Sequence, residues 1–190
     1  MGDVREVHAY VLVVDAARID NDDVAVVTMR HTSGALSTLH ITMRTHTTGE
    51  ERYEVHGTRG TLVMRWPYHS THTLEPAIIE VHERSRRVTD HTLSTSWCPE
   101  REIGTHWQYL NELRHFCACI AEQREPAVGG REGYAVVEIL NAAYLSAQTG
   151  ETVRLPLDRV PDFDALFARL RADSRWTIED ADITGWDWRY

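Results

Sequence analysis

The chain has 190 residues, 42% hydrophobic and 26% charged, with 20 cationic side chains against 29 acidic ones. That length and apolar fraction suit one folded domain of ordinary size and exclude collagen-like, coiled-coil and disordered chains. The net charge of −9 argues against a nucleic-acid partner. The sequence also lacks a signal peptide and any apolar run of roughly 18 residues, which predicts a cytoplasmic protein without a membrane partner.

The first half of the chain has the pattern of β-strands. Stretches rich in β-branched residues alternate between apolar and polar positions and are separated by turns containing Gly, Asp and Ser. We expect strands over residues 4–14, 24–30, 35–45, 52–56, 61–66, 77–84 and 87–93. Strands that follow one another so closely favour a largely antiparallel sheet.

After Pro99 the apolar residues recur at steps of three and four, which is typical of amphipathic helices. We expect helices over residues 104–123, 131–149 and 162–172, and a short strand over residues 152–156. Gly150 has the place of a C-terminal helix cap, and Tyr144 and Ser146 are expected to pack and hydrogen-bond rather than to act in catalysis. Strands followed by helices predict an α+β fold, an open-faced β-sheet with helices packed on one face.

Two residue counts exclude particular chemistry. All 20 cationic side chains are arginine, so a Schiff-base lysine and a P-loop lysine are both excluded. The three cysteines, Cys98, Cys117 and Cys119, lack the spacing of a disulfide framework or a zinc site. His69 and His72 have a spacing that suits a metal, but no third ligand is evident, so we expect no metal site.

One face of the strand over residues 35–45 is polar, and its apolar side chains face the other way. The polar side chains are Thr38, His40, Thr42 and Arg44. We expect His40 and Arg44 to meet Arg30 or His56 across the sheet. On one interpretation Arg44, Arg30 and Thr42 bind an anionic or sugar-like substrate and His40 is a catalytic acid–base group. On the other, this face lies in a dimer interface or in solvent.

The start of the first long helix is a second candidate site. His106 and Trp107 stand there, and the N-terminus of a helix favours anions. We expect His106 to be a catalytic candidate and Trp107 a substrate-binding one. The alternative for Trp107 is a ring that only packs where the chain enters the helix.

Three stretches carry motifs in a fixed order. Residues 23–35 form an acidic-x-Ala strand with a Gly-Ala hairpin, and residues 53–62 contain the turn Gly57-Thr58-Arg59-Gly60. Residues 116–156 contain the sequence Arg124-Glu125-Pro126 and, farther along the chain, Gly150. This ordered set resembles the C-terminal domain of the glucose–fructose oxidoreductase/inositol dehydrogenase/MocA family. The resemblance implies a sheet domain like that of dihydrodipicolinate reductase over residues 1–157. Residues 158–190 would then form a C-terminal helix and an acidic, aromatic tail that pack on it.

The resemblance also implies what this chain lacks. The family joins an N-terminal dinucleotide-binding domain to the sheet domain, and it uses a lysine in a Glu-Lys-Pro motif and an Asp-x-x-x-His pair. This chain has no Gly-x-Gly-x-x-Gly, no lysine, and no histidine with an aspartate four residues before it. We therefore expect that the chain alone binds no cofactor, and that NAD(P) enters only with a separate Rossmann-domain subunit.

Three functions remain open. The first is the substrate-binding and oligomerisation domain of such an oxidoreductase, inactive in redox chemistry by itself. The second is a stand-alone domain that catalyses a cofactor-independent isomerase, cyclase or lyase reaction with histidine as acid–base group. The third is a non-enzymatic dimeric binding module. A homo-oligomer formed through the uncovered sheet face is compatible with all three.

Overall fold

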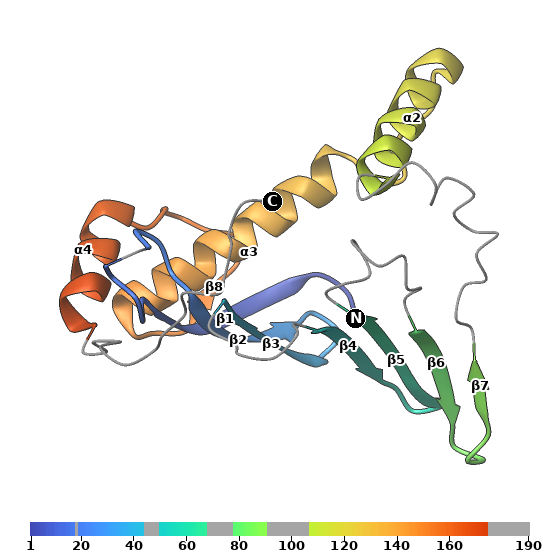
Figure 1. Cartoon of the computed structure of the whole chain (residues 1–190), viewed down its shortest axis with the longest axis horizontal. Coiled ribbons are helices and arrows are strands. Elements are labelled where there is room, and N and C mark those ends of the chain that lie inside the picture. Colours follow the sequence, from blue (N-terminus) through green and yellow to red (C-terminus); the bar gives the residue numbers. More distant parts are fainter. Residues whose placement is uncertain (18, 44–49, 68–77, 91–106, 175–190) are drawn as a thin grey trace. The chain divides into compact units, whose positions relative to one another are not determined.

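Figure 1 shows the computed structural model of the chain, which describes residues 1–17, 19–43, 50–67, 78–90 and 107–174. The chain divides into two compact units. The first unit consists of Met1–Arg44 with Val128–Tyr190, and the second consists of Thr45–Ala127. Each unit contains one four-stranded sheet, and every pairing within the two sheets is antiparallel. The α+β class is confirmed, and the seven strands expected in the first half are all present.

The sheet of the first unit has the strand order β3-β2-β1-β8. Its strands are β1 (Val4–Leu12), β2 (Val24–His31), β3 (Leu36–Thr42) and β8 (Val153–Arg154). Successive side chains of a strand point to opposite faces. In β1, Val7, Ala9 and Val11 are buried, whereas Tyr10 and Leu12 are exposed. The sheet therefore has one face in the core and one open face.

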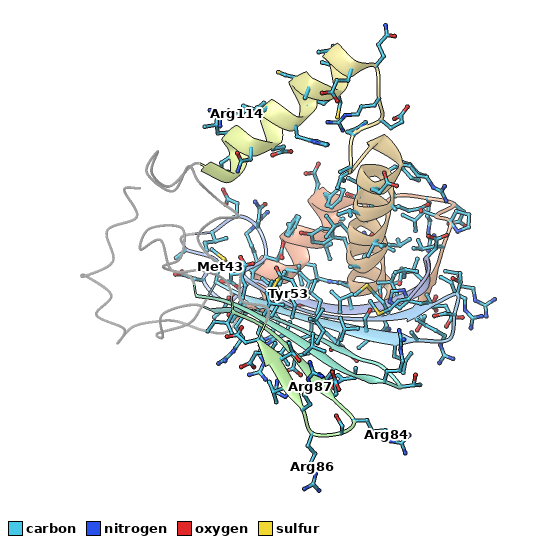
Figure 2. All side chains as sticks on the ribbon, turned by 90° about the vertical axis from the view of Figure 1, so that its right-hand side faces the viewer. Met43, Tyr53, Arg84, Arg86, Arg87 and Arg114 are labelled. Carbon is cyan, nitrogen blue, oxygen red and sulfur yellow. The ribbon has the colours of Figure 1, made fainter. Side chains whose placement is uncertain are left out.

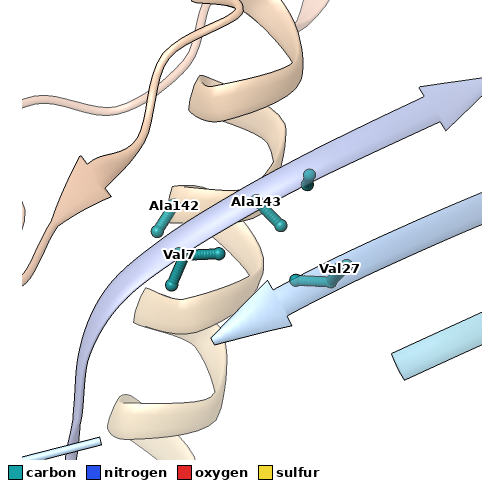
Figure 3. Close-up of a cluster of buried hydrophobic side chains, with 5 residues drawn as sticks. Val7, Val27, Ala142 and Ala143 are labelled. Atoms are coloured by element: carbon teal, nitrogen blue, oxygen red, sulfur yellow. The ribbon is translucent and has the colours of Figure 1, made fainter. Parts of the chain in front are cut away.

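The core lies between this sheet and helix α3 (Gly130–Thr149). Figure 3 shows α3 crossing β1, with Ala142 and Ala143 of the helix beside Val7 of β1 and Val27 of β2. Alanines at the crossing let the helix backbone approach the sheet closely, so the short β-branched side chains beneath it fill the remaining space. The prediction that helices pack on one sheet face is confirmed.

Two helix ends in this unit follow the signals in the sequence. Gly150 ends α3 with a left-handed φ of 75°, and its N–H donates to the carbonyl of Ser146 at 2.7 Å. Helix α4 (Phe163–Asp173) begins after Asp162, whose carboxylate accepts a hydrogen bond from the N–H of Ala165 at 3.0 Å. A second buried cluster joins α4 to the strand side of the unit and consists of Val11, Val13, Leu166 and Leu170.

The sheet of the second unit has the strand order β4-β5-β6-β7. Its strands are β4 (Glu50–His56), β5 (Gly60–Pro67), β6 (Ile78–Glu83) and β7 (Val88–Asp90). The expected turn closes the β4–β5 hairpin, because the N–H of Gly57 donates to the carbonyl of Gly60 at 2.8 Å. The last two strands, β6 and β7, pair with each other, and Arg84 and Arg86 project from the turn between them (Figure 2).

Helix α2 (Trp107–Glu122) also belongs to the second unit. It ends at Gln123, which adopts a left-handed φ of 52°. The N–H of Gln123 donates to Ile120 O at 3.3 Å and that of Arg124 to Cys119 O at 3.0 Å, the hydrogen-bond pattern of a Schellman motif. Cys119 is buried and Cys117 is exposed, because residues two apart on a helix lie on different sides of it.

Within the residues that the structure describes, no helix combines the length and the apolar character needed to cross a bilayer.

Candidate functional site

The open face of the first sheet, opposite α3, is the main candidate surface. Its side chains form rows across β1, β2 and β3 because paired residues of neighbouring strands share a face. The rows are Glu6–Arg30–Leu36, His8–Thr28–Thr38, Tyr10–Val26–His40 and Leu12–Val24–Thr42. Tyr10 and Leu36 are 69% and 70% exposed. The surface thus combines large exposed apolar side chains with imidazole, hydroxyl and guanidinium groups.

His40 lies on β3, the edge strand of this sheet, opposite Val26. Its side chain is exposed, and among the described residues no hydrogen bond or ion pair is made by it. An imidazole can donate and accept hydrogen bonds, but an acid–base histidine is normally oriented by a second polar group. Among the described residues, no such group orients the exposed imidazole of His40.

Arg30 lies well away from His40. The register pairs His40 with Val26, and the four-residue step from Val26 to Arg30 spans about 13 Å at 3.3 Å per residue. The expectation that His40 meets Arg30 across the sheet is therefore wrong. The guanidinium of Arg30 instead faces Glu6, with its Nε at 3.2 Å from Glu6 Oε2.

Glu6 is the centre of a cationic corner of the open face. Besides Arg30, the guanidinium of Arg5 lies 3.7 Å and that of Arg154 lies 4.0 Å from Glu6 Oε1. Three guanidinium groups around one carboxylate leave an excess of positive charge. This corner therefore attracts anions, although Arg30 itself is already engaged by a carboxylate.

His56 belongs to a separate network in the second unit. Its Nε2 lies 3.1 Å from Glu54 Oε2 and its Nδ1 lies 3.1 Å from Thr61 Oγ1. Arg52 donates from Nε to Glu54 Oε1 at 2.7 Å. That hydrogen bond, assisted by the charge of Arg52 and by the bond from His56, holds the pKa of Glu54 below its usual range. The structure thus gives His56 partners on its own sheet.

Some expected site residues lie outside the described part of the chain. Arg44 and His106 are among them, and so is the side chain of Trp107 at the start of α2. Cys98 and the two histidines of the 69–72 pair are also outside it. In the described ranges, no group of three or more His, Cys, Asp or Glu side chains could hold a metal ion.

Tyr144 and Ser146 of α3 have the structural roles expected of them. The hydroxyl of Tyr144 donates to Asp22 Oδ1 at 2.8 Å, and its ring meets Phe163 and Phe167 edge to face at 5.4 and 5.8 Å. Ser146 is fully buried and hydrogen-bonded. Both residues join α3 to the rest of the first unit, so neither belongs to a ligand site.

Tyr144 should make the stability of the first unit depend on alkaline pH. Partial burial, the hydrogen bond to Asp22 and the charge of the Asp22 carboxylate, in that order of size, together raise the pKa of Tyr144 to about 12. The unfolded phenol titrates near pH 10. The protonated Tyr144 side chain therefore contributes fully to the free energy of unfolding below about pH 10, and this contribution is lost as the pH rises towards about 12.

Urea unfolding of the wild type and of Tyr144→Phe at a series of pH values checks this prediction. The wild type should be the more stable protein up to about pH 10, by about 1 kcal/mol, and the difference should shrink above that pH. A difference that stays constant or grows between about pH 10 and 12 would contradict the assigned role.

Sequence analysis missed the apolar members of the open face, chiefly Tyr10, Leu12 and Val26. The alternation along β1 could have predicted them. Val7 and Ala9 lie on the core side of the strand, so the residues that alternate with them lie on the open face. The polar character expected for this face came from β3 alone. The structure shows that β1 and β2 add exposed apolar surface to it.

Comparison with known proteins identifies the fold. A family model matches residues 2–155 and is described as the C-terminal alpha/beta domain of an oxidoreductase family, that of glucose–fructose oxidoreductase, inositol dehydrogenase and MocA. The chain belongs to this family. The match confirms the resemblance inferred from the ordered motifs and covers both sheets and all the described helices except α4.

A characterised member of the family spans a much longer sequence than this chain. D-Apiose dehydrogenase from Paraburkholderia graminis is 29% identical over 160 residues, which are 81% of this chain and 40% of that protein. The chain thus spans about two fifths of the length of the curated relative it matches.

Solved structures show the same fold. An oxidoreductase from Agrobacterium radiobacter, in complex with NAD+, L-tartaric acid and magnesium, has a TM-score of 0.61 at 23% identity and matches 80% of this chain and 43% of its own. Levoglucosan dehydrogenase, in complex with NADH and levoglucosan, has a TM-score of 0.65 at 21% identity, over 83% of this chain and 46% of its own. At these identities the likeness establishes the architecture, and each of these proteins is about twice as long as the matched part.

Proposed function

We propose that this chain is the substrate-binding and oligomerisation domain of a family oxidoreductase that acts on a sugar-like substrate. The observation that carries the proposal is the open face of the first sheet, where Tyr10 and Leu12 are 69% and 52% exposed in the same rows as His40 and Thr42. Exposed apolar side chains on a sheet face mark an association surface. Self-association through a two-fold axis is the commonest way to cover such a surface.

We infer that dinucleotide binding is supplied by a separate domain. A pyrophosphate site needs glycines between a strand and the free N-terminus of a helix. Gly129 and Gly130 instead follow helix α2, and the N–H of Gly129 already donates to Glu132 Oε2 at 2.9 Å. That carboxylate occupies the start of α3 and would repel a phosphate, so this turn does not fit the pyrophosphate of NAD(P). Hydride transfer therefore requires a dinucleotide-binding domain as partner.

The edge of the open face suits a polyhydroxylated ligand. His40 and Thr42 lie on the edge strand β3, whereas Tyr10 and Val26 lie farther inside the face. Imidazole and hydroxyl groups pair with sugar hydroxyls as donors and as acceptors. The names of the relatives, D-apiose dehydrogenase and levoglucosan dehydrogenase among them, also point to carbohydrate substrates. We therefore place the ligand at the rim of a self-associating surface.

Tyr10→Asp tests the association surface. The wild type should form a dimer, and the aspartate should weaken it about a hundredfold, because a two-fold interface contains the buried charge twice and each costs about 1.4 kcal/mol or more. Ile41→Asp is the matched control, since Ile41 is 49% exposed on the same sheet but pairs with Ala25 on the core-side face. Sedimentation velocity measures the dimerisation of the wild type and of both variants. A monomeric wild type, or equal effects of the two substitutions, would refute the proposed interface.

His40→Ala tests the ligand site. Its removal should weaken the binding of D-apiose about fivefold, the effect of losing one hydrogen bond of about 1 kcal/mol, and should leave the dimer intact. His8→Ala, which alters an imidazole on the central strand β1 of the same face, serves as control. Isothermal titration gives the affinities. If His40→Ala binds D-apiose as tightly as the wild type does, His40 does not contact the ligand.

A further inference from the structure

One end of the second sheet carries four arginines on two neighbouring turns. Arg59 lies in the turn between β4 and β5. The turn from β6 to β7 contains Arg84, Arg86 and Arg87. The two turns lie side by side, because β5 and β6 are neighbouring strands and the N–H of Arg84 donates to the carbonyl of Arg59 at 3.4 Å. These four residues, the arginine tip, therefore share one end of the sheet.

Three of these guanidinium groups have no carboxylate partner in the part of the chain that the structure describes. Arg87 faces Glu83, with its Nε at 3.8 Å from Glu83 Oε1. The side chains of Arg59, Arg84 and Arg86 are exposed, and among the described residues they make no ion pair or hydrogen bond. Arg84 and Arg86 extend away from the ribbon at the turn (Figure 2). The arginine tip is thus a local excess of positive charge on a chain whose net charge is −9.

Arg86 has a backbone conformation that arginine rarely adopts. Its φ is 66°, in the left-handed region. The N–H of Arg86 donates to Glu83 O at 2.9 Å and that of Glu83 to Arg87 O at 2.8 Å, the pattern of a hairpin loop whose left-handed position favours glycine. Any other side chain at this position lowers stability. Such strain is concentrated at functional sites, which favours a binding role for the Arg86 guanidinium.

The shape and charge of the arginine tip select among anionic partners. A small anion is normally held in a concave pocket, whereas Arg84 and Arg86 project from a turn. The net charge of −9 disfavours a nucleic acid. Stable anchoring to a membrane needs an apolar group besides basic residues, and residues 83–87 include no apolar side chain. Carboxylates on a protein segment fit better, because a guanidinium binds a carboxylate through two parallel hydrogen bonds.

We propose that the arginine tip is a docking site for an acidic segment of a partner protein. Arg59, Arg84 and Arg86 supply the guanidinium groups that pair with its carboxylates. Because these groups are exposed, salt screens their attraction for the segment and weakens the contact. The tip belongs to the second unit, whereas the proposed function rests on the open face of the first, so the docking site and the proposed function can fail independently.

The test measures binding of a decapeptide of alternating Glu and Ser to the full chain, by fluorescence anisotropy at low salt. Arg84→Ser with Arg86→Ser should weaken binding about tenfold, because two exposed charge-assisted pairs are lost. The matched control is Arg131→Ser with Arg159→Ser, which removes the same charge from exposed positions of the first unit. A wild type that does not bind the peptide, or equal weakening by the two pairs of substitutions, would overturn the proposal.

Arg86→Gly separates binding from folding. Glycine adopts the left-handed φ without strain, so this variant should raise the thermal midpoint by about 2–4 °C and weaken peptide binding about threefold. A lower midpoint together with weaker binding would mean that the Arg86 side chain supports the fold, and the proposal fails. If a decanucleotide or an anionic lipid vesicle binds more tightly than the peptide through the same arginines, the tip recognises phosphate groups and the proposal also fails.

Discussion

The substitution Asp23→Ala is expected to lower the free energy of unfolding by about 3 kcal/mol, because it leaves one buried and one partly buried N–H group without an acceptor. The Asp23 side chain is 2% exposed. Its Oδ1 accepts from the N–H of Val14 at 2.8 Å and its Oδ2 from that of Asp15 at 3.1 Å. The backbone of Asp23 also donates to Leu12 O at 3.1 Å and accepts from Met43 N at 2.8 Å. One residue thus ties the end of β1 to both ends of the β2–β3 hairpin.

Urea unfolding at neutral pH measures the effect of Asp23→Ala. Asp23→Asn should fall between the wild type and the alanine variant, because a carboxamide keeps one acceptor oxygen. The control is Asp20→Ala, an exposed residue of the same loop, which should change the unfolding free energy by less than about 0.5 kcal/mol. A loss below about 1 kcal/mol for Asp23→Ala would show that the loop does not depend on this carboxylate.

The same residue influences the candidate site. Val24, the next residue, pairs with Thr42 at the rim of the open face. If the loop before β2 loosens, the row of Leu12, Val24 and Thr42 is the first to lose its alignment. Asp23→Ala is therefore expected to weaken self-association as well as folding, whereas Asp20→Ala should affect neither.

Sequence could predict most of the helices and strands because local chemistry determines where they begin and end. Helix α3 ends where Gly150 adopts a positive φ, a conformation that costs other residues energy. Helix α4 begins where the carboxylate of Asp162 can accept from an N–H of the first turn. These signals lie within four residues of the boundary they set. Neither needs any information about the rest of the fold.

The neighbours of the site residues were harder to predict because they depend on register. The short turn after His31 sets the register of the β2–β3 hairpin, and counting outward from it places His40 opposite Val26. Counting from that turn would have shown that Arg30 is too far from His40. The partner of Arg30 could not be obtained this way. Glu6 comes from β1, which joins β2 through a long loop, and the length of such a loop does not fix a register.

Helix α2 shows a second limit of prediction from sequence. Its periodicity predicts an apolar side that should be covered, and the structure confirms the helix while leaving Leu113, Phe116 and Ile120 exposed. Periodicity identifies the side of a helix that avoids water, but it carries no information about the surface that meets it. The helix is thus predictable from sequence, whereas the surface that meets its apolar side is not.

Ser146→Ala is expected to lower the free energy of unfolding by about 3 kcal/mol, because one buried and one partly buried hydrogen bond are lost and both partners are left unpaired. The Ser146 hydroxyl is fully buried. It accepts from the N–H of Ala9 at 3.0 Å and donates to the carbonyl of Glu151 at 2.6 Å. Strand β8 pairs with β1 only at Glu6 and Val7, so the N–H of Ala9 lies beyond the ladder. Ser146 supplies the acceptor that a longer strand would have provided.

The position of this hydroxyl makes the prediction specific to one amide. In Ser146→Ala, hydrogen exchange at the Ala9 amide should accelerate more than that of its neighbours in β1, beyond what global destabilisation explains. Thr149→Ala is the matched control, because Thr149 is an exposed hydroxyl on the same helix that bonds only the local carbonyl of Leu145 and the N–H of Glu151. It should cost less than about 0.5 kcal/mol. Similar losses for the two variants would mean that α3 is held to the sheet by apolar packing around Ala142 and Ala143 alone.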